Sequence, residues 1–390
     1  MDTIQQLDRE YIASTYGRFP VTLVSGKGSV AEDEQGKRYI DFGAGISVNT
    51  FGYCDTVWQE AVKNQLDALQ HTSNLYYTAP CSALAAELCR RTGMKKVFFS
   101  NSGAEANECA IKAARKYGAE HHGRDAYWII TLKNSFHGRT LTTLAATGQD
   151  HFHELFQPLT PGFLYAEPED LEGLTELTAS HKVCGILIEC IQGEGGVNAL
   201  SRDFVQGIAK LCREKDILLL CDEVQAGNGR SGQLYSYMND DVTPDVATTA
   251  KGLGGGLPIG VTMLGEKVQD IFHPGDNGST FGGNPVVCAG ALSVLKRLDD
   301  DFLAEVRAKS DYLFRALSKA PGVKQVTGMG LMIGVEPEKG SVAELAGRCL
   351  EKGLLVLTAG QNRLRLLPAL NIPDSLLQEG TEILKEVLAD

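Results

Sequence analysis

The sequence lacks an apolar run long enough to cross a membrane. The run 183–191 is far too short, because a spanning helix needs about 20 apolar residues. The first residues are polar and mixed in charge, without the apolar centre of a signal peptide. Positive charge is also in deficit, since the formal net charge is −12. These features exclude a membrane or a nucleic acid as the main partner and predict a cytoplasmic protein.

Cysteine pairs and metal-binding spacings are missing as well. Ten cysteines are scattered without a C-x-x-C pair, and most stand in apolar runs, among them Cys184, Cys190, Cys221 and Cys288. We expect reduced core thiols rather than a disulfide framework. The histidine pairs His121–His122 and His151–His153 have no companion cluster at metal-ligand spacing. No metal site is therefore predicted.

Nucleotide-binding motifs are absent or out of context. Neither Gly26-Lys27 nor Gly36-Lys37 completes the pattern G-x-x-x-x-G-K-[ST] of a phosphate-binding loop. Residues 227–232 match G-x-G-x-x-G, but residues 223–226 separate them from the preceding apolar strand, and no convincing helix follows. A dinucleotide-binding oxidoreductase, the main alternative from another class, is therefore rejected.

The chain does show the alternation of strands and helices that is typical of an α/β protein. Its 390 residues, 43% hydrophobic and 22% charged, suffice for a large domain and a smaller one. From about residue 80, apolar runs alternate with helical patterns, which predicts a mostly parallel sheet covered on both faces. The expected strands are 95–99, 127–132, 183–190, 217–221, 246–250 and 261–264. The expected helices include 56–69, 82–91, 105–117, 304–317, 342–352 and 376–388.

One lysine ends a short β-like run and is followed at once by glycines. Lys251 closes the run 246–250, and Gly252, Gly254, Gly255 and Gly256 come after it. A strand then holds its backbone, and no side chain crowds the turn that it faces. This setting suits an amine that forms and releases a covalent bond in every turnover. A surface lysine before a flexible loop is the alternative for an isolated match of this kind.

A capped helix start follows the expected strand 95–99. Ser102 and Glu105 form a capping-box pattern, and Gly103 and Ala104 leave the first amides of the helix uncovered. Bare amides at a helix N-terminus beyond a strand end make a phosphate site. A plain capped helix explains the serine and glutamate equally well, but it does not require Gly-Ala.

Further polar residues stand at other strand ends. Asp222 ends a buried strand, where it could keep a ring nitrogen protonated, ligate Mg²⁺ or serve as a structural acid. Phe136 could cover a flat ring, and Arg139 could clamp a carboxylate with two hydrogen bonds. Glu194 lies among glycines, and residues 279–285 offer two hydroxyls and bare amides. Their common position near strand ends favours one joint site.

These motifs together make the sequence similar to the class III (subgroup II) aminotransferases, which use pyridoxal phosphate. The resemblance covers nearly the whole chain in ordered blocks: 39–46, 73–77, 101–108, 136–140, 222–225, 251–256 and 279–285. It implies a fold-type I enzyme with a seven-stranded type of sheet in a large domain, residues 56–295. A smaller α+β domain would be formed by residues 1–55 and 296–390.

The resemblance also implies how the cofactor ring is held. Lys251 would bind pyridoxal phosphate covalently, and Asp222 would pair with its pyridinium nitrogen. Gln225 would approach the phenolic oxygen. Phe136 would cover one ring face and Val224 the other. A buried carboxylate beside the ring nitrogen favours the protonated form that carbanion stabilisation needs.

The phosphate and the assembly follow from the same resemblance. Ser102, Gly103 and Ala104 would form the phosphate site, with backbone N–H groups as donors. The enzyme would be a homodimer with its sites at the interface, and Thr280 would reach the phosphate from the neighbouring subunit.

Four residues are expected to bind substrate by the family pattern. Arg139 would bind a carboxylate, and Ser279 stands beside Thr280 at the edge of the site. Arg365 would bind the α-carboxylate of glutamate, and Glu194 would pair with it when the other substrate is bound. Arg365 would thus have a partner with either substrate bound, since a buried charge without a partner is costly.

The expected reaction moves the δ-amino group of N2-acetylornithine to 2-oxoglutarate, a step of arginine biosynthesis. Ornithine, succinylornithine, 4-aminobutyrate or a related ω-amine is the alternative donor, and an aminomutase is a further possibility. A ligand sensor of this fold would need an extra DNA-binding segment, for which the acidic chain has no room. Ala226 and Asn228 depart from the commonest family pattern outside the expected chemistry, and residues 50–55 depart from it near the expected substrate tail.

Overall fold

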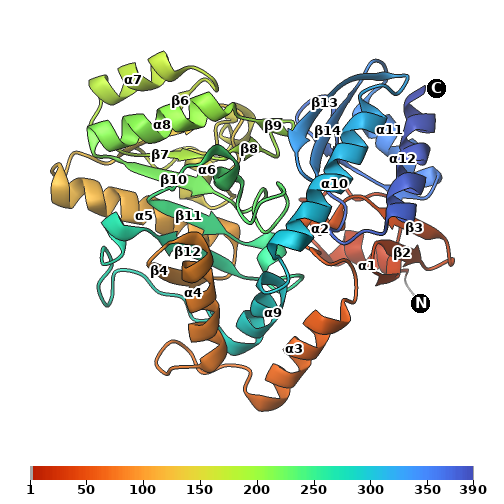
Figure 1. The fold of residues 1–390 in the computed structure, drawn as a ribbon, viewed down its shortest axis with the longest axis horizontal. Coiled ribbons are helices and arrows are strands. Elements are labelled where there is room, and N and C mark those ends of the chain that lie inside the picture. Colours follow the sequence, from red (N-terminus) through yellow and green to blue (C-terminus); the bar gives the residue numbers. More distant parts are fainter. Residues whose placement is uncertain (1–2, 390) are drawn as a thin grey trace.

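A computed structural model describes residues 3–389 and centres on a seven-stranded sheet (Figure 1). In spatial order its strands are β4 (Lys96–Ser100), β12 (Gly260–Leu264), β11 (Val246–Thr249), β10 (Leu218–Asp222), β7 (Val183–Ile188), β5 (Trp128–Leu132) and β6 (Phe163–Ala166). Only β12 is antiparallel to its neighbours. The mostly parallel α/β fold predicted from the sequence is confirmed.

Six of the seven strands lie where the sequence predicts them, and β6 was missed. β6 is a four-residue edge strand with two half-buried residues at its centre. It therefore has neither the length nor the continuous burial of β7 and β10, whose residues are all buried. Residues 227–232 form turns rather than the helix that a dinucleotide site requires.

Helices cover both faces of the sheet (Figure 1). The alanine-rich helix α5 (Gly103–His121) packs on one face against β12, β11 and β7. Helices α7 (Leu171–Ser180) and α8 (Arg202–Lys215) pack on the other face. In α8 the apolar residues recur at helical spacing and are buried, namely Phe204, Val205, Ile208, Leu211 and Cys212. The sheet is thus dry on both sides, as its apolar strands require.

The two ends of the chain build two further sheets. The N-terminal sheet contains β1 (Leu23–Lys27), β2 (Val30–Asp33) and β3 (Arg38–Asp41), and β15 (Leu354–Leu355) pairs in parallel with β3. The C-terminal sheet has the order β13 (Val323–Met329), β14 (Met332–Pro337), β17 (Arg363–Leu366), β16 (Leu357–Ala359). The division of the chain at residues 55 and 295 stays a prediction.

The remaining elements connect these sheets. Their helices are α1 (Ile4–Tyr11), α2 (Ala44–Ser47), α3 (Thr56–Ala68), α4 (Ala79–Thr92), α6 (Leu141–Ala146), α9 (Pro285–Leu295), α10 (Asp300–Leu317), α11 (Val342–Glu351) and α12 (Asp374–Ala389). A short hairpin pairs β8 (Ile191–Gln192) with β9 (Asn198–Ala199). Within residues 3–389 no helix is long and apolar enough to cross a bilayer. All ten cysteines are free thiols.

Candidate active site

Nine of the predicted site residues line one cavity of about 470 Å³. They are Ser102, Gly103, Ala104, Phe136, Arg139, Asp222, Val224, Gln225 and Lys251. The segments that carry them follow the carboxyl ends of β4, β5, β10 and β11. These four strands run in the same direction, so their ends meet at one edge of the sheet, where ligands of α/β proteins bind.

Lys251 stands in the left-handed backbone region just beyond β11, with φ 42°. Asn228 Nδ2 donates to the Ala250 carbonyl at 3.2 Å, and Thr50 Oγ1 donates to the Gly252 carbonyl at 2.8 Å. These two bonds hold the backbone on both sides of a conformation that is costly for a lysine. Asn228, expected outside the chemistry, therefore lies next to the lysine segment. Burial lowers the pKa of Lys251 below its ordinary value, which favours the neutral amine.

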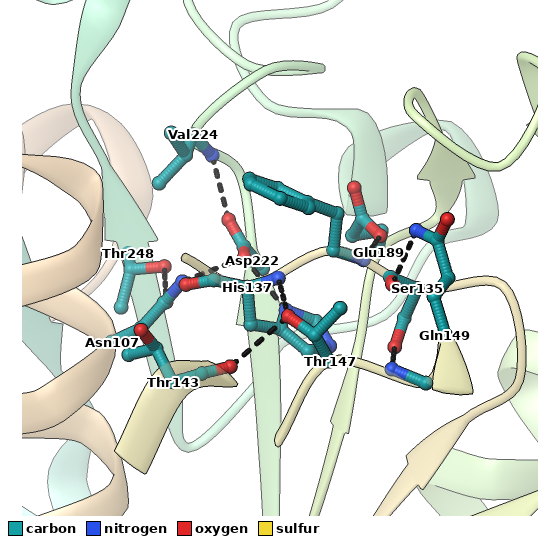
Figure 2. A network of polar contacts seen from close by, with 12 residues as sticks. Asn107, Ser135, His137, Thr143, Thr147, Gln149, Glu189, Asp222, Val224 and Thr248 are labelled. Carbon is teal, nitrogen blue, oxygen red and sulfur yellow. Dashed lines mark hydrogen bonds and ion pairs between the residues drawn. The ribbon is translucent and has the colours of Figure 1, made fainter. Parts of the chain in front are cut away.

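Asp222 is buried and held from three sides (Figure 2). Asn107 Nδ2 donates to Asp222 Oδ2 at 2.7 Å, and the Val224 N–H donates to Oδ1 at 3.0 Å. His137 Nδ1 lies 2.8 Å from Oδ2. Because a carboxylate only accepts, Nδ1 is the nitrogen that carries the proton. Thr248 Oγ1 donates to Asn107 Oδ1 at 2.7 Å, which fixes the orientation of that amide. The site thus presents a preoriented negative charge.

Asn107, His137 and Glu189 line the cavity but were not predicted. Asn107 stands on α5 one turn after Gly103 and Ala104, so helical periodicity could have placed it on their side of the helix. Glu189 directly follows β7, much as Asp222 stands at the end of β10. The sequence therefore carried a positional signal for both.

Glu189 is a second buried carboxyl group in the cavity wall. Its Oε2 accepts the Phe136 N–H at 2.9 Å. Burial raises the pKa of Glu189 well above its ordinary value, and the neighbouring Asp222 raises it further. The cavity thus places an anchored carboxylate, Asp222, near a buried carboxyl group, Glu189, whose protonated form is favoured.

The predicted cap of α5 is present, with one difference. Ser102 Oγ accepts the Glu105 N–H at 3.2 Å, whereas the Glu105 carboxylate accepts the Asn101 N–H at 2.9 Å. Gly103 is required for packing as well, since a Cβ there would lie 2.5 Å from Val224 Cγ1. The missing side chain lets Val224 approach the first turn and keeps its amides bare, as an anion site needs.

Arg139 lies over two aromatic rings at the exposed side of the cavity. Its guanidinium carbon is 4.1 Å from the centre of the Phe152 ring and 5.3 Å from that of Phe136. The two rings meet edge to face, with centres 6.0 Å apart. These cation–π contacts leave the edge of the guanidinium available for a carboxylate. Phe152 was not predicted, because it enters through tertiary contact alone.

Glu194 and Arg365 form an ion pair beside the cavity. Arg365 Nη1 donates to Glu194 Oε1 at 2.5 Å and to Gln225 Oε1 at 2.7 Å. Gln225 Nε2 lies 3.2 Å from the same carboxylate oxygen. Burial alone would raise the pKa of Glu194, but the Arg365 guanidinium outweighs it and leaves that pKa below its ordinary value. Both partners are therefore charged, and Gln225 links them to the cavity wall.

Ser279 and Thr280 lie outside this cavity in the same chain. Ser279 Oγ accepts the Asn101 side-chain amide at 3.1 Å and the Gly282 N–H at 2.9 Å. Thr280 lines a separate hollow with His71 and Tyr77. Their roles in substrate and phosphate binding stay predictions, because a single chain does not bring them to Lys251.

A parallel sheet that delivers a lysine amine, a carboxylate and a bare helix N-terminus to one edge defines a class of protein, the pyridoxal-phosphate enzymes of fold-type I. The cavity fits this cofactor, since Asp222 can face a ring nitrogen while the amides of Gly103 and Ala104 can face a phosphate. When bound, the cofactor supplies the electron sink of the reaction.

Comparison with known proteins identifies the family. The model of the class III aminotransferases matches residues 11–388, and the chain belongs to this family. It is therefore a pyridoxal-phosphate-dependent aminotransferase.

Relatives and solved structures agree with this assignment. An acetylornithine aminotransferase of Haemophilus ducreyi is 49% identical over 100% of this chain and 99% of its own length. The crystal structure of N-acetylornithine aminotransferase from Stenotrophomonas maltophilia has a TM-score of 0.85 at 36% identity, covering 98% of each chain. The ornithine aminotransferase of Toxoplasma gondii has a TM-score of 0.94 at 32% identity, covering 98% of this chain and 94% of its own.

Lys251 is expected to carry the cofactor covalently. Borohydride should fix the cofactor to the peptide that contains Lys251, detectable by mass spectrometry with loss of the visible absorption band. Lys251→Ala should give no adduct and lower the rate at least ~1000-fold, because both the attachment point and the base are removed. Lys210→Ala, an exposed lysine on α8, is the control and should behave as wild type. An adduct on another lysine would contradict the assignment.

Proposed function

We propose that the enzyme transfers the δ-amino group of N2-acetylornithine to 2-oxoglutarate, giving N-acetylglutamate 5-semialdehyde and glutamate in arginine biosynthesis. The carrying observation is the Glu194–Arg365 pair at the edge of the cavity that contains Lys251. A site with a guanidinium that can be covered or free accepts both a terminal amine and an α-amino acid. The name of the Haemophilus ducreyi relative supports acetylornithine as the donor.

Within this proposal, Asp222 and Lys251 have separate tasks. Asp222, held by Asn107 and His137, keeps the ring nitrogen of the cofactor protonated. The amine of Lys251, once released, would act as the base that moves the proton between the substrate carbon and the cofactor carbon on the other side of the transferred nitrogen.

The substrate is oriented by groups at both ends of the cavity. Arg139 holds a carboxylate against its aromatic platform. Arg365 holds the α-carboxylate of glutamate when Glu194 turns aside, and Glu194 neutralises it when the terminal-amine donor is bound.

The amino donor is tested by a panel of substrates. We expect kcat/KM to be highest with N2-acetylornithine among acetylornithine, succinylornithine, ornithine and 4-aminobutyrate, with 2-oxoglutarate as the acceptor. A clear preference for free ornithine or 4-aminobutyrate would disprove the proposed donor and leave the aminotransferase class intact. Conversion of one substrate without an acceptor would indicate an aminomutase.

The pair of Glu194 and Arg365 predicts opposite effects on the two half-reactions. In Glu194→Gln, Arg365 loses its carboxylate partner and keeps only the amide of Gln225, so the acetylornithine half should slow while the glutamate half is spared or improved. A change of about 1–3 kcal/mol in their ratio is expected for a partly solvated charge pair. Arg365→Lys should instead harm the glutamate half, because a point charge replaces a two-pronged donor. Single-turnover spectroscopy measures each half, and equal slowing of both in Glu194→Gln would refute the switch.

We further propose a cytoplasmic homodimer in which Thr280 completes the phosphate site of the partner. Tyr76 (72%) and Tyr77 (103%), which line one hollow with Thr280, are exposed, and so are their chain neighbours Leu75 (84%) and Phe281 (60%). Such a patch is typical of an interface. The buried free thiols fit a reducing compartment.

The dimer predicts that a charge in this patch disrupts both assembly and cofactor retention. Tyr77→Asp should shift the sedimentation coefficient to that of a monomer and weaken cofactor binding. Thr175→Asp, at an exposed position of α7, is the control and should change neither. A Tyr77→Asp protein that remains dimeric with the cofactor bound would refute this interface.

A further inference from the structure

Glu194 stands at the tip of a hairpin that lies between the central sheet and the C-terminal sheet. We name residues 191–199 the Glu194 hairpin; it comprises β8, the tip and β9. Figure 1 shows β8 and β9 beside β13 of the C-terminal sheet, and β9 contacts β13. Val197 in the tip is fully buried in an apolar cluster that contains residues of both regions: Ile191, Ala226, Met332, Ala359 and Leu367. The position of Glu194 therefore depends on how this tip is fixed.

Arg363, on β17 of the C-terminal sheet, binds the far side of the tip. Its Nη1 donates to the Gly196 carbonyl at 2.7 Å and to Asn198 Oδ1 at 2.6 Å. The same nitrogen lies 2.8 Å from Thr327 Oγ1 on β13. One nitrogen with two protons thus faces three acceptors, two on the hairpin and one on the C-terminal sheet. Charge-assisted bonds of this kind are stronger than neutral ones.

Further contacts surround this connection. The Gly360 N–H donates to the backbone carbonyl of Glu194 itself at 2.9 Å. Arg363 Nη2 lies 3.5 Å from Glu336, but Glu336 also has Lys324 at 2.6 Å. Glu336 therefore keeps a cationic partner without Arg363. The contacts specific to Arg363 are those with the hairpin and, on β13, with Thr327 and with Gln325 Oε1 at 3.3 Å.

Arg363 and Arg365 stand two residues apart on β17, so their side chains leave the same face of the strand. Arg365 pairs with the side chain of Glu194, whereas Arg363 binds the backbone of the tip behind it. Strand β17 thus contacts both the side chain of Glu194, through Arg365, and the hairpin backbone that supports it, through Arg363. If the tip were free, the distance between Glu194 and Arg365 would vary with every movement of the hairpin.

We propose that Arg363 is a positioning residue for the Glu194–Arg365 switch. It holds the hairpin backbone, so that the pair opens by rotation of the Glu194 side chain and not by displacement of the tip. This inference rests on the proposed function. A purely structural tie between the two sheets would affect both half-reactions equally, whereas a positioning role affects the half in which the pair must be closed.

The test uses Arg363→Gln in the enzyme with its cofactor bound. Lys324→Met, which also removes a positive charge from the C-terminal sheet, is the control. Arg363→Gln should slow the acetylornithine half about fivefold relative to the glutamate half, because Glu194 then covers Arg365 less often. Arg363→Lys should lie between this variant and wild type. Lys324→Met should leave the ratio unchanged. Hydrogen exchange of residues 191–199, measured with and without cofactor, should rise in Arg363→Gln only.

Several outcomes would overturn the proposal. One is an unchanged ratio of the half-reactions in Arg363→Gln; another is strict additivity of Arg363→Gln with Glu194→Gln, since residues that act on one pair must be coupled. If Arg363→Gln does not fold, Asn198→Ala removes one acceptor and should shift the ratio in the same direction. A wild-type enzyme that prefers another ω-amine would refute the proposed donor, and the Arg363 ratio is then measured with that amine.

Discussion

The arrangement of the site depends on keeping one carboxylate charged in a buried place. Asp222 is 4% exposed, and an isolated charge there would be several kcal/mol too costly to persist. Its partners come from three separate segments: Asn107 from α5, His137 from the loop after β5, and the Val224 amide from its own loop. Satisfying this charge therefore fixes the helix, the loop and the strand end relative to one another.

The same requirement accounts for neighbouring packing. The Asn107 amide can face Asp222 only if α5 starts close to the Val224 loop, and Gly103 permits that approach. Strand geometry then separates two adjacent acids. Asp222 faces the cavity, while Glu223 faces the interior and accepts N–H groups from Ser236 and Tyr237. Burial raises the pKa of Glu223 to about 7, despite these hydrogen bonds.

The sequence predicted the parts of the site whose signals are local. Lys251 followed by glycines, Asp222 at a strand end and the cap at Ser102 depend on neighbours in the chain, and the structure places all three around one cavity. Thr50, Asn228, Phe152 and Arg363 could not be predicted, because their contacts arise only from the tertiary fold. The strand β6 was not predicted for another reason, since its short half-buried pattern is also typical of a loop. Ser279 and Thr280 lie outside this cavity in the same chain, so their roles stay predictions.

The charges around the cavity favour backbone amides over an arginine as the expected ligands of the cofactor phosphate. Arg365 is already paired with Glu194, and Arg139 lies on its aromatic platform at the exposed side. A further arginine at the start of α5 would add a positive charge near Lys251, whose pKa already responds to Glu194, Arg365 and Asp222. The N-terminus of α5 supplies partial positive charge without a mobile side chain. On the proposed function, a phosphate held by these amides leaves the Glu194–Arg365 pair available to open and close.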